Sequence, residues 1–470
     1  METKNAWLSY KPEDKTELNR ICEAYKQYIS LGKTERECYR LTVGAARQAG
    51  YISLEEAQKL SAPAAPGTKI YAGIMGKAVA LFCLGSSPMQ EGMNILGAHI
   101  DSPRLDVKQN PLYEDGGLAY LDTHYYGGIK KYQWAAIPMA LHGVVVRKDG
   151  STAEVVIGED AGDPVVGVTD LLIHLAADQM TKKASVVIEG EDLDLLIGSE
   201  PVPEEKKEGR EDLAEAKGSV LKNIKAILKE KYNIEEEDFL SAELEAVPAG
   251  PARDMGLDRS MVLGYGQDDR ICAFTSLEAM LQLQGVPAKT SVCLLVDKEE
   301  IGSMGATGMQ SRFFENTVAE IMELSGQYSE LGLRRCLSRS RMLSSDVNAG
   351  FDPLYVSAFE KKNASFLGHG LVFCKFTGAR GKSGSNDCSA EYMAVIRRIM
   401  EKAGVYYQTA ELGKVDVGGG GTIAYIAGNY GMEVIDAGVA ILSMHAPYET
   451  ASKADIFEAV KGYRAFLEQA

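Results

Sequence analysis

Two consecutive glutamates that follow an apolar segment are the residues with the clearest capacity for chemistry. In LLVDKEEIGSMGATG, Glu299 and Glu300 follow the apolar run after Asp297 and Lys298 and precede glycine-rich sequence. Neighbouring carboxylates can divide two tasks, because one can bind a metal while the other takes a proton from water and passes it to a leaving amine. A solvated strand end is the structural alternative for the same pattern. The pair therefore predicts a hydrolytic metal site only if further ligands exist elsewhere.

Further residues of the required types occur in four other segments. A two-metal hydrolase needs imidazoles, hard carboxylate ligands, a carboxylate that bridges the cations and a free carboxylate near the attacking water. Residues i and i+2 of a strand share a face, so Asp101 can orient the imidazole of His99. Adjacent aspartates at a helix start are usually caps, but one of them could bridge two cations. The candidates are His99 and Asp101 in GAHIDSP, Asp268 in GQDDRI, Asp346 in SSDVNAG and His445 in AILSMHAPYE.

Alternating strands and helices are expected to position these residues. From about residue 263 the sequence predicts helices at 270–283, 311–325 and 389–403, separated by the apolar strands TSVCLLV, LVFCKF and AGVAILSM. In the first hundred residues we expect a helix around 18–29, a short helix after Ser53, and the strands LFCLG and NILGAHI. This order predicts an α/β fold with a mostly parallel sheet, whose carboxyl-terminal strand ends carry the site.

A β-rich insertion interrupts this pattern. Glycine-punctuated sequence with strand-like segments begins at about Pro103, and a turn at 148–150 indicates a hairpin. A charged loop at 201–218 and a helix at 220–231 follow. We therefore predict a catalytic domain formed by residues 1–102 and 257–470, with a β-rich domain inserted at 103–256.

Composition and charge exclude several other classes. The 470-residue chain is 45% hydrophobic and has a formal charge of −16, which argues against nucleic acid as a partner. It contains no apolar run of the roughly 20 residues that a membrane span needs, and its first residues do not form a signal peptide. Its eight cysteines are scattered without a C-x-x-C pair, which favours buried thiols in a reducing compartment. The cytoplasm is the expected location.

Five motifs, in family order over nearly the whole chain, resemble the aspartyl aminopeptidase and vacuolar aminopeptidase I family of two-zinc metallopeptidases. They are GAHIDSPRLDVKQNP, VDKEEIGSMG, SSDVNAGFDP, TGARGKSGSND and SMHAPYET. The resemblance implies a zinc-peptidase catalytic domain and gives each candidate a role. In that assignment His99 and Asp346 bind one zinc, Glu300 and His445 bind the other, Asp268 bridges both, Glu299 is the general base, and Asp101 supports His99.

The resemblance also implies an oligomer. The inserted domain would be a dimerisation domain, and the dimers would assemble into a tetrahedral dodecamer. His174, in VTDLLIHLAADQ, would reach the active site of the neighbouring subunit. The alternative is that His174 and its neighbours Leu171, Leu172 and Leu175 form the core side of a helix.

Substrate recognition is the least determined part of the resemblance. Lys375 and Arg380, with Lys382 nearby, could pair with an acidic substrate side chain, whereas the vacuolar branch prefers neutral or hydrophobic N-terminal residues. Gly420 belongs to a run of glycines at 418–421, which predicts either a tight turn or close approach of the backbone to substrate or a metal ligand. The second explanation is favoured because relatives have this loop beside the active site.

The function predicted from the sequence is removal of the N-terminal amino acid from unblocked peptides. Water activated by two divalent cations would attack the scissile carbonyl, with Glu299 as general base. Zinc is expected, and cobalt or manganese suit the same ligands. The alternatives are a deacylase on the same fold and a metal-free scaffold or cargo protein. A phosphate-binding loop at 381–383 is excluded, because that motif requires glycine where the chain has Phe376.

Overall fold

The computed structural model describes residues 4–202 and 218–470, and it divides into two units. The first unit comprises Met1–Ser102, Ala252–Met444 and Tyr448–Ala470, and the second comprises Pro103–Pro251 and His445–Pro447. The boundary expected after residue 256 therefore lies after Pro251, and a short segment around His445 groups with the insertion. Most of the charged loop expected at 201–218 lies outside the described residues.

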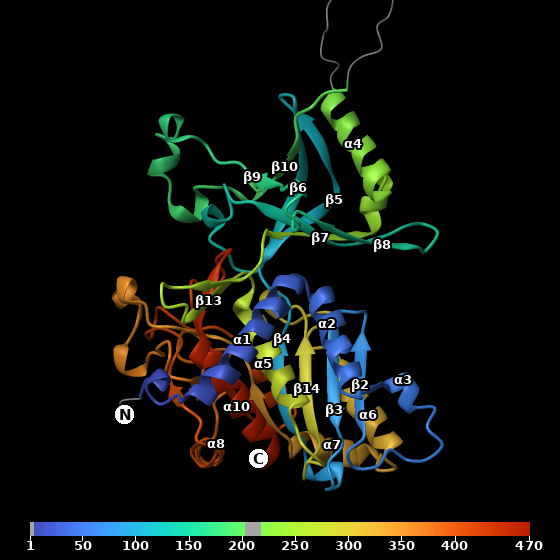
Figure 1. Ribbon diagram of the computed structural model, residues 1–470, viewed down its shortest axis with the longest axis vertical. Coiled ribbons are helices and arrows are strands. Elements are labelled where there is room, and N and C mark those ends of the chain that lie inside the picture. Colours follow the sequence, from blue (N-terminus) through green and yellow to red (C-terminus); the bar gives the residue numbers. More distant parts are fainter. Residues whose placement is uncertain (1–3, 203–217) are drawn as a thin grey trace, which may run out of the picture. The chain divides into compact units, whose positions relative to one another are not determined.

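The first unit is built on a sheet with nine strands in the described part of the chain, in the order β1–β2–β3–β14–β4–β15–β19–β17–β18. Its central strands β14, β4, β15 and β19 are parallel, whereas β3 and β17 pair with them in the antiparallel direction. Figure 1 labels four neighbouring strands of this sheet, β4, β14, β3 and β2. The strands are β1 (Ile52–Ser53), β2 (Lys69–Ile74), β3 (Ala78–Cys83), β4 (Asn94–His99), β14 (Ser291–Val296), β15 (Arg341–Ser344), β17 (Leu371–Cys374), β18 (Tyr407–Thr409) and β19 (Glu433–Gly438).

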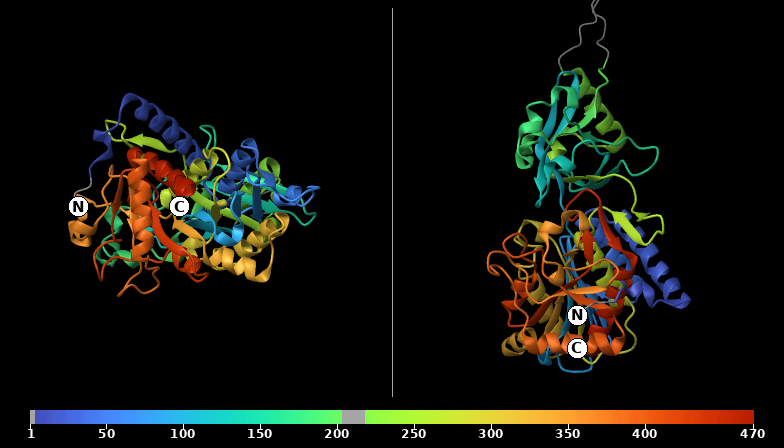
Figure 2. Two further views of the ribbon diagram at one scale, coloured as in Figure 1. Left: turned by 90° about the horizontal axis from the view of Figure 1, so that it is seen from below. Right: turned by 90° about the vertical axis from the view of Figure 1, so that its left-hand side faces the viewer.

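Helices cover both faces of this sheet. Alternate residues of β3 belong to two separate apolar clusters, with Leu81 in one and Phe82 in the other, so the strand is buried on both sides. The first face carries α1 (Pro12–Leu31), α2 (Glu35–Gln48), α5 (Gln267–Leu281), α8 (Ala390–Ala403) and α10 (Lys453–Gln469). The second carries α3 (Leu54–Ala57), α6 (Phe313–Leu324), α7 (Glu330–Ser338) and α9 (Ala424–Gly428). The contact between α1 and α10 is visible as dark blue beside red in Figure 2.

Local sequence signals placed most of these elements correctly. The Ser53 hydroxyl accepts a hydrogen bond from the Glu56 amide at 3.1 Å, which is the cap expected for the short helix α3. The helix expected at 270–283 is α5, and the strand TSVCLLV is β14. The expected α/β architecture is confirmed.

The segment AGVAILSM is not the single strand expected. Strand β19 ends at Gly438, and β20 belongs to a second, five-stranded sheet of the described residues, ordered β12–β13–β21–β20–β16. A Cβ on Gly438 would lie 1.7 Å from the Asp346 carbonyl oxygen. The chain therefore passes from the first sheet to the second at the point where its backbone comes close to that of Asp346. The strands of this sheet are β12 (Arg253–Met255), β13 (Met261–Gly264), β16 (Asn348–Ala349), β20 (Ala440–Leu442) and β21 (Glu449–Ser452).

The second unit is an antiparallel sheet with one packed helix. In the described residues its strand order is β8–β7–β11–β5–β6–β10–β9. Helix α4 (Ser219–Tyr232) packs on it, and the Glu114 carboxylate of β5 accepts the Leu221 amide at the helix start, at 2.7 Å. The strands are β5 (Arg104–Asp115), β6 (Leu118–Tyr126), β7 (Met139–Val146), β8 (Thr152–Ile157), β9 (Gly167–Val168), β10 (Leu195–Gly198) and β11 (Ala242–Pro248). The hairpin expected at 148–150 joins β7 and β8.

The burial expected for the cysteines is confirmed, since all eight are buried. Among the residues that the structure describes, no helix combines the length and the apolar character needed to cross a membrane.

Candidate metal and catalytic site

Three neighbouring parallel strands of the first unit end at one edge of the sheet. Val296 of β14 pairs with His99 of β4, and Ser344 of β15 pairs with Gly97. The residues that follow these strands therefore leave the sheet at the same edge, and they include Glu299 and Asp346. This register explains why residues almost 250 positions apart in the chain form one cluster.

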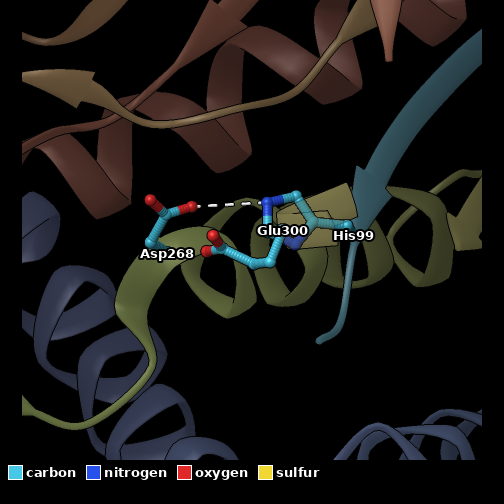
Figure 3. A group of neighbouring side chains, drawn as sticks. All are labelled: His99, Asp268 and Glu300. Atoms are coloured by element: carbon cyan, nitrogen blue, oxygen red, sulfur yellow. Dashed lines mark ion pairs between the residues drawn. The ribbon is translucent and has the colours of Figure 1, made fainter. Parts of the chain in front are cut away.

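The buried imidazole of His99 lies between carboxylates. Its Nδ1 is 3.0 Å from the Asp101 backbone carbonyl oxygen and 3.2 Å from an Asp101 carboxylate oxygen. Its Nε2 is 3.3 Å from Asp268 Oδ1, and the dashed line in Figure 3 marks this pair. Glu299 Oε2 lies 3.9 Å from the same Nε2. Burial by itself lowers the pKa of His99, but the hydrogen bonds to Asp101 and Asp268 outweigh it and raise the pKa well above its usual value.

Two overlapping groups of side chains could hold metal ions. His99, Asp268 and Glu300 offer ligand atoms within 4.8 Å of one another, and so do Asp268, Asp269 and Asp346. Figure 3 shows the first group, with its side chains converging from separate elements. Asp268 is the residue that both groups share. Imidazole nitrogen and carboxylate oxygen are ligands that zinc accepts.

The electrostatics of this cluster fit a cation. Burial, followed by the charges of Asp269, Glu299 and Asp268, raises the pKa of Asp346 well above its usual value. Burial also raises the pKa of Asp269, and Asp268 raises it further, against the opposing effect of His99. Several buried carboxylates in contact repel one another, and a divalent cation compensates this repulsion. The residues present therefore match the donor set and the charge of a metal centre.

Asp101 has a second task that the sequence did not indicate. Besides contacting His99, its carboxylate accepts the backbone amides of Glu299 at 3.1 Å and of Glu300 at 3.2 Å. These two residues begin the short 3₁₀ turn Glu299–Ile301, directly after Lys298, whose φ of +67° lies in the left-handed region. One buried carboxylate thus fixes both the histidine and the turn that carries the two glutamates.

Two further carboxylates support the cluster and were not selected from the sequence. Asp269 Oδ2 accepts the backbone amide of His99 at 3.3 Å, and Glu449 Oε2 accepts the backbone amide of Asp268 at 3.0 Å. Both side chains are buried. Their presence in the motifs GQDDRI and SMHAPYET was the sequence signal that could have identified them, but the ligand roles in these motifs were assigned to Asp268 and His445.

His445 is the expected ligand that neither group contains. It groups with the second unit, where its Nδ1 lies 2.7 Å from the Gly128 carbonyl oxygen. Metal-ligating histidines commonly use one ring nitrogen for such a hydrogen bond and coordinate through the other. Its role as a ligand stays a prediction.

The expected substrate-binding cations lie on a loop after β17. Lys375 and Arg380 are exposed. Lys382 is paired with Asp387 at 3.0 Å and lies over the ring of Phe376, 3.7 Å from its centroid. Of these three cations, Lys382 is therefore already engaged, and Lys375 and Arg380 stay the candidates for contact with substrate.

The glycine run at 418–421 has a packing role. The Gly378 amide donates to the Gly420 carbonyl at 2.7 Å, which joins this run to the loop after β17. A Cβ on Gly419 would lie 2.0 Å from the Gly378 carbonyl oxygen, and one on Gly418 would lie 1.8 Å from the Leu412 oxygen. Close approach to neighbouring backbone therefore requires glycine at 418 and 419, whereas a Cβ on Gly420 would make only an ordinary contact with the Leu412 side chain.

His174 does not lie in a helix core. It belongs to the short 3₁₀ turn Ile173–Leu175 and is exposed. Leu171, Leu172 and Leu175 are 47%, 54% and 68% exposed, so the explanation of this segment as buried helix is wrong. A row of exposed leucines is unusual for a monomer surface and is typical of a contact surface.

A buried histidine–carboxylate cluster at the carboxyl ends of parallel strands is an arrangement that suits a metal-dependent hydrolase. The family model "Aminopeptidase I zinc metalloprotease (M18)" matches residues 28–467. The chain belongs to this family of zinc aminopeptidases, as the resemblance of its motifs predicted. It is therefore a metalloexopeptidase, and neither a deacylase nor a metal-free scaffold is supported.

Individual relatives agree with this membership. A probable M18 family aminopeptidase 1 of Clostridium acetobutylicum is 58% identical over 466 residues, which cover 99% of this chain and 98% of the relative. The crystal structure of an M18 family aminopeptidase from Thermotoga maritima superposes with a TM-score of 0.92 at 42% identity, and the match covers 100% of both chains. The structure of the S. cerevisiae mApe1 dodecamer shares the fold, with a TM-score of 0.75 at 18% identity over 96% of this chain and 97% of that chain.

Proposed function

We propose that this zinc aminopeptidase works with two divalent cations per subunit, most simply two zinc ions. The observation that carries the proposal is the pair of ligand groups that share Asp268. The assignment from the motifs has His99 and Asp346 at one cation and Glu300 and His445 at the other, whereas the two groups combine His99 with Glu300 and Asp346 with Asp269. The accumulation of buried carboxylates around one imidazole supports two cations, because a single divalent charge would leave part of the repulsion uncompensated.

Glu299 is the general base in this proposal. Cations bound in the cluster would polarise the scissile carbonyl and acidify the attacking water. The Glu299 side chain is 16% exposed, so its carboxylate can contact a water molecule although most of its surface is covered by protein. It takes the proton from this water and delivers it to the leaving amine, and the Asp101 bond to its backbone amide fixes the position from which it acts.

Glu299→Gln tests this assignment. The variant should bind zinc in the wild-type amount but lose turnover of an amino-acid anilide by about 100-fold or more, since an amide cannot accept the proton. Glu323→Gln, an exposed position on α6, is the matched control and should keep full activity. Near-native turnover by a folded, zinc-loaded Glu299→Gln enzyme would contradict the proposal.

We propose peptides with free N-termini as substrates, with the side-chain preference decided at the loop after β17. Lys375 and Arg380 are exposed cations there, and they favour an acidic residue if they reach the substrate side chain. A profile over N-terminal amino acids with wild type, Lys375→Met and Lys382→Met decides between the two preferences. Selective loss of Asp and Glu substrates in Lys375→Met supports acidic specificity, and equal profiles support a neutral or hydrophobic preference. N-acetylated substrates should not be cleaved.

We further propose a homo-oligomer assembled through the second unit, with a tetrahedral dodecamer as the final form. The exposed leucines beside His174 support this proposal, together with Ile173, which is 65% exposed. In the assembly His174 would act at the site of a neighbouring subunit. Ile173→Asp should reduce the particle mass in solution, whereas Leu257→Asp, at an exposed position of the first unit, should not. Unchanged mass in Ile173→Asp would argue against this surface as an interface.

We place the enzyme in the cytoplasm. Its eight free, buried cysteines suit a reducing compartment. Cell fractionation with an antibody against the chain tests this location, and recovery of the protein outside the cytoplasmic fraction would exclude it.

A further inference from the structure

A cavity on the second face of the first unit shares no lining residue with the metal cluster. It measures about 650 Å³ and is lined by residues that precede and begin α6, by α7 and by α9. Its lining includes Met309, Leu337 and Ile426, which are 3%, 3% and 6% exposed. Tyr425 and Tyr430 contribute aromatic side chains with hydroxyl groups to its wall. The lining thus combines buried apolar side chains with polar groups, which is typical of small-molecule sites.

The charge of the lining is positive. Three arginines, Arg312, Arg334 and Arg335, face one carboxylate, Glu315. This excess contrasts with the formal charge of −16 of the whole chain. In a protein that repels anions overall, a concave group of arginines is the kind of place where an anion is attracted.

The three arginines differ in what they contact. Arg312 is paired with Glu315, and Arg334 is paired with Glu330, which does not line the cavity. The side chain of Arg335 makes no hydrogen bond or ion pair with any residue that the structure describes in 4–202 and 218–470. Its guanidinium group can therefore bind a ligand without giving up a contact within the protein.

We propose that this cavity binds a small anion with at least two negative charges, of the phosphate or polycarboxylate type. The planar guanidinium group offers parallel donors that match two oxygens of a phosphate or carboxylate. Arg335 would make the main contact and Arg312 a second one. The tyrosine hydroxyls would donate to remaining oxygens, and the apolar side chains would accept an uncharged part of the ligand.

Binding of defined anions to the intact holoenzyme tests the proposal. Inorganic phosphate and citrate are titrated calorimetrically, at constant ionic strength, into wild type, Arg335→Gln and Arg312→Gln/Arg335→Gln. The control is Arg398→Gln, which removes the same charge from an exposed position on α8 outside the cavity. The two probes distinguish a phosphate ligand from a polycarboxylate one. Anion binding at the metal cluster contributes equally in every variant, because none of the substitutions alters a residue of that cluster.

The expected result is that wild type and Arg398→Gln bind at least one of the two anions. Arg335→Gln should weaken this binding by at least about tenfold, and the double variant should weaken it further. Equal dissociation constants in wild type and Arg335→Gln would overturn the proposal, and so would the absence of binding by wild type at millimolar anion. Unchanged melting temperatures of the variants without anion show that a loss of binding is not a loss of fold.

Discussion

Replacement of Asp101 by asparagine tests the one side chain that contacts both His99 and the turn that carries Glu299 and Glu300. The native carboxylate contacts His99 Nδ1 and accepts the backbone amides of Glu299 and Glu300. An asparagine of nearly the same shape offers one acceptor oxygen and places an NH₂ group where the second oxygen was. At least one of the two backbone N–H groups would then lose its acceptor, and the histidine would lose the adjacent negative charge.

The expected cost follows from these contacts. A buried donor left without an acceptor costs about 1–3 kcal/mol, which corresponds to roughly 5- to 150-fold in an equilibrium constant. Loss of a carboxylate that orients a metal-ligating histidine costs about 10- to 100-fold in metal affinity or activity. We therefore expect Asp101→Asn to weaken zinc binding and to lower kcat, each by about 10- to 100-fold, because both His99 and the Glu299–Glu300 turn become less fixed.

Two measurements check this prediction. Zinc affinity is obtained by competition with a chromogenic chelator, and kcat is obtained with an amino-acid anilide at saturating zinc. Asp115→Asn, at an exposed position at the end of β5, is the matched control and should behave as wild type. If folded Asp101→Asn enzyme kept wild-type zinc affinity and kcat, the reasoning about its three contacts would be refuted.

Three further outcomes are expected. Asp268→Ala should remove the ligand shared by both groups, so elemental analysis should find less than half of the wild-type zinc, and retention of all the metal would exclude a bridging role. Glu449→Gln keeps one acceptor for the Asp268 amide but loses its charge, so zinc affinity should fall by less than in Asp101→Asn; an equal or larger fall would give Glu449 a direct role. Burial raises the pKa of Asp455 to about 8, so the native state keeps a proton that the unfolded chain, with a pKa of 3.8, releases. The free energy of unfolding should therefore fall as the pH rises from about 4 to about 8, and Asp455→Asn should reduce that fall by up to about 1.4 kcal/mol per pH unit in chemical denaturation; equal slopes would contradict it.

The sequence determined the types of the reacting groups and the elements that carry them. Apolar segments identified β14 and α5, and the capping residue Ser53 identified α3, because these signals act between residues a few positions apart. The order of strands and helices also predicted the α/β architecture. The five motifs indicated the family, and the family model that matches residues 28–467 confirmed it.

Only the tertiary structure decided which of these residues meet. The register that aligns Val296 with His99 joins distant parts of the chain, and no local pattern encodes such a pairing. The break between β19 and β20 likewise depends on the approach of Gly438 to the Asp346 backbone. The exposure of Leu172 could not be read from its apolar neighbours, because burial depends on what the rest of the fold places against a segment.

Asp101 illustrates this division most clearly. Its spacing from His99 predicted support of the imidazole, since strand periodicity alone brings residues i and i+2 to one face. Its hydrogen bonds to the Glu299 and Glu300 amides depend on two strands that are adjacent in the sheet and far apart in the sequence. The sequence therefore determined the chemistry that each residue can perform, and the pairing of distant strands decided that they perform it together.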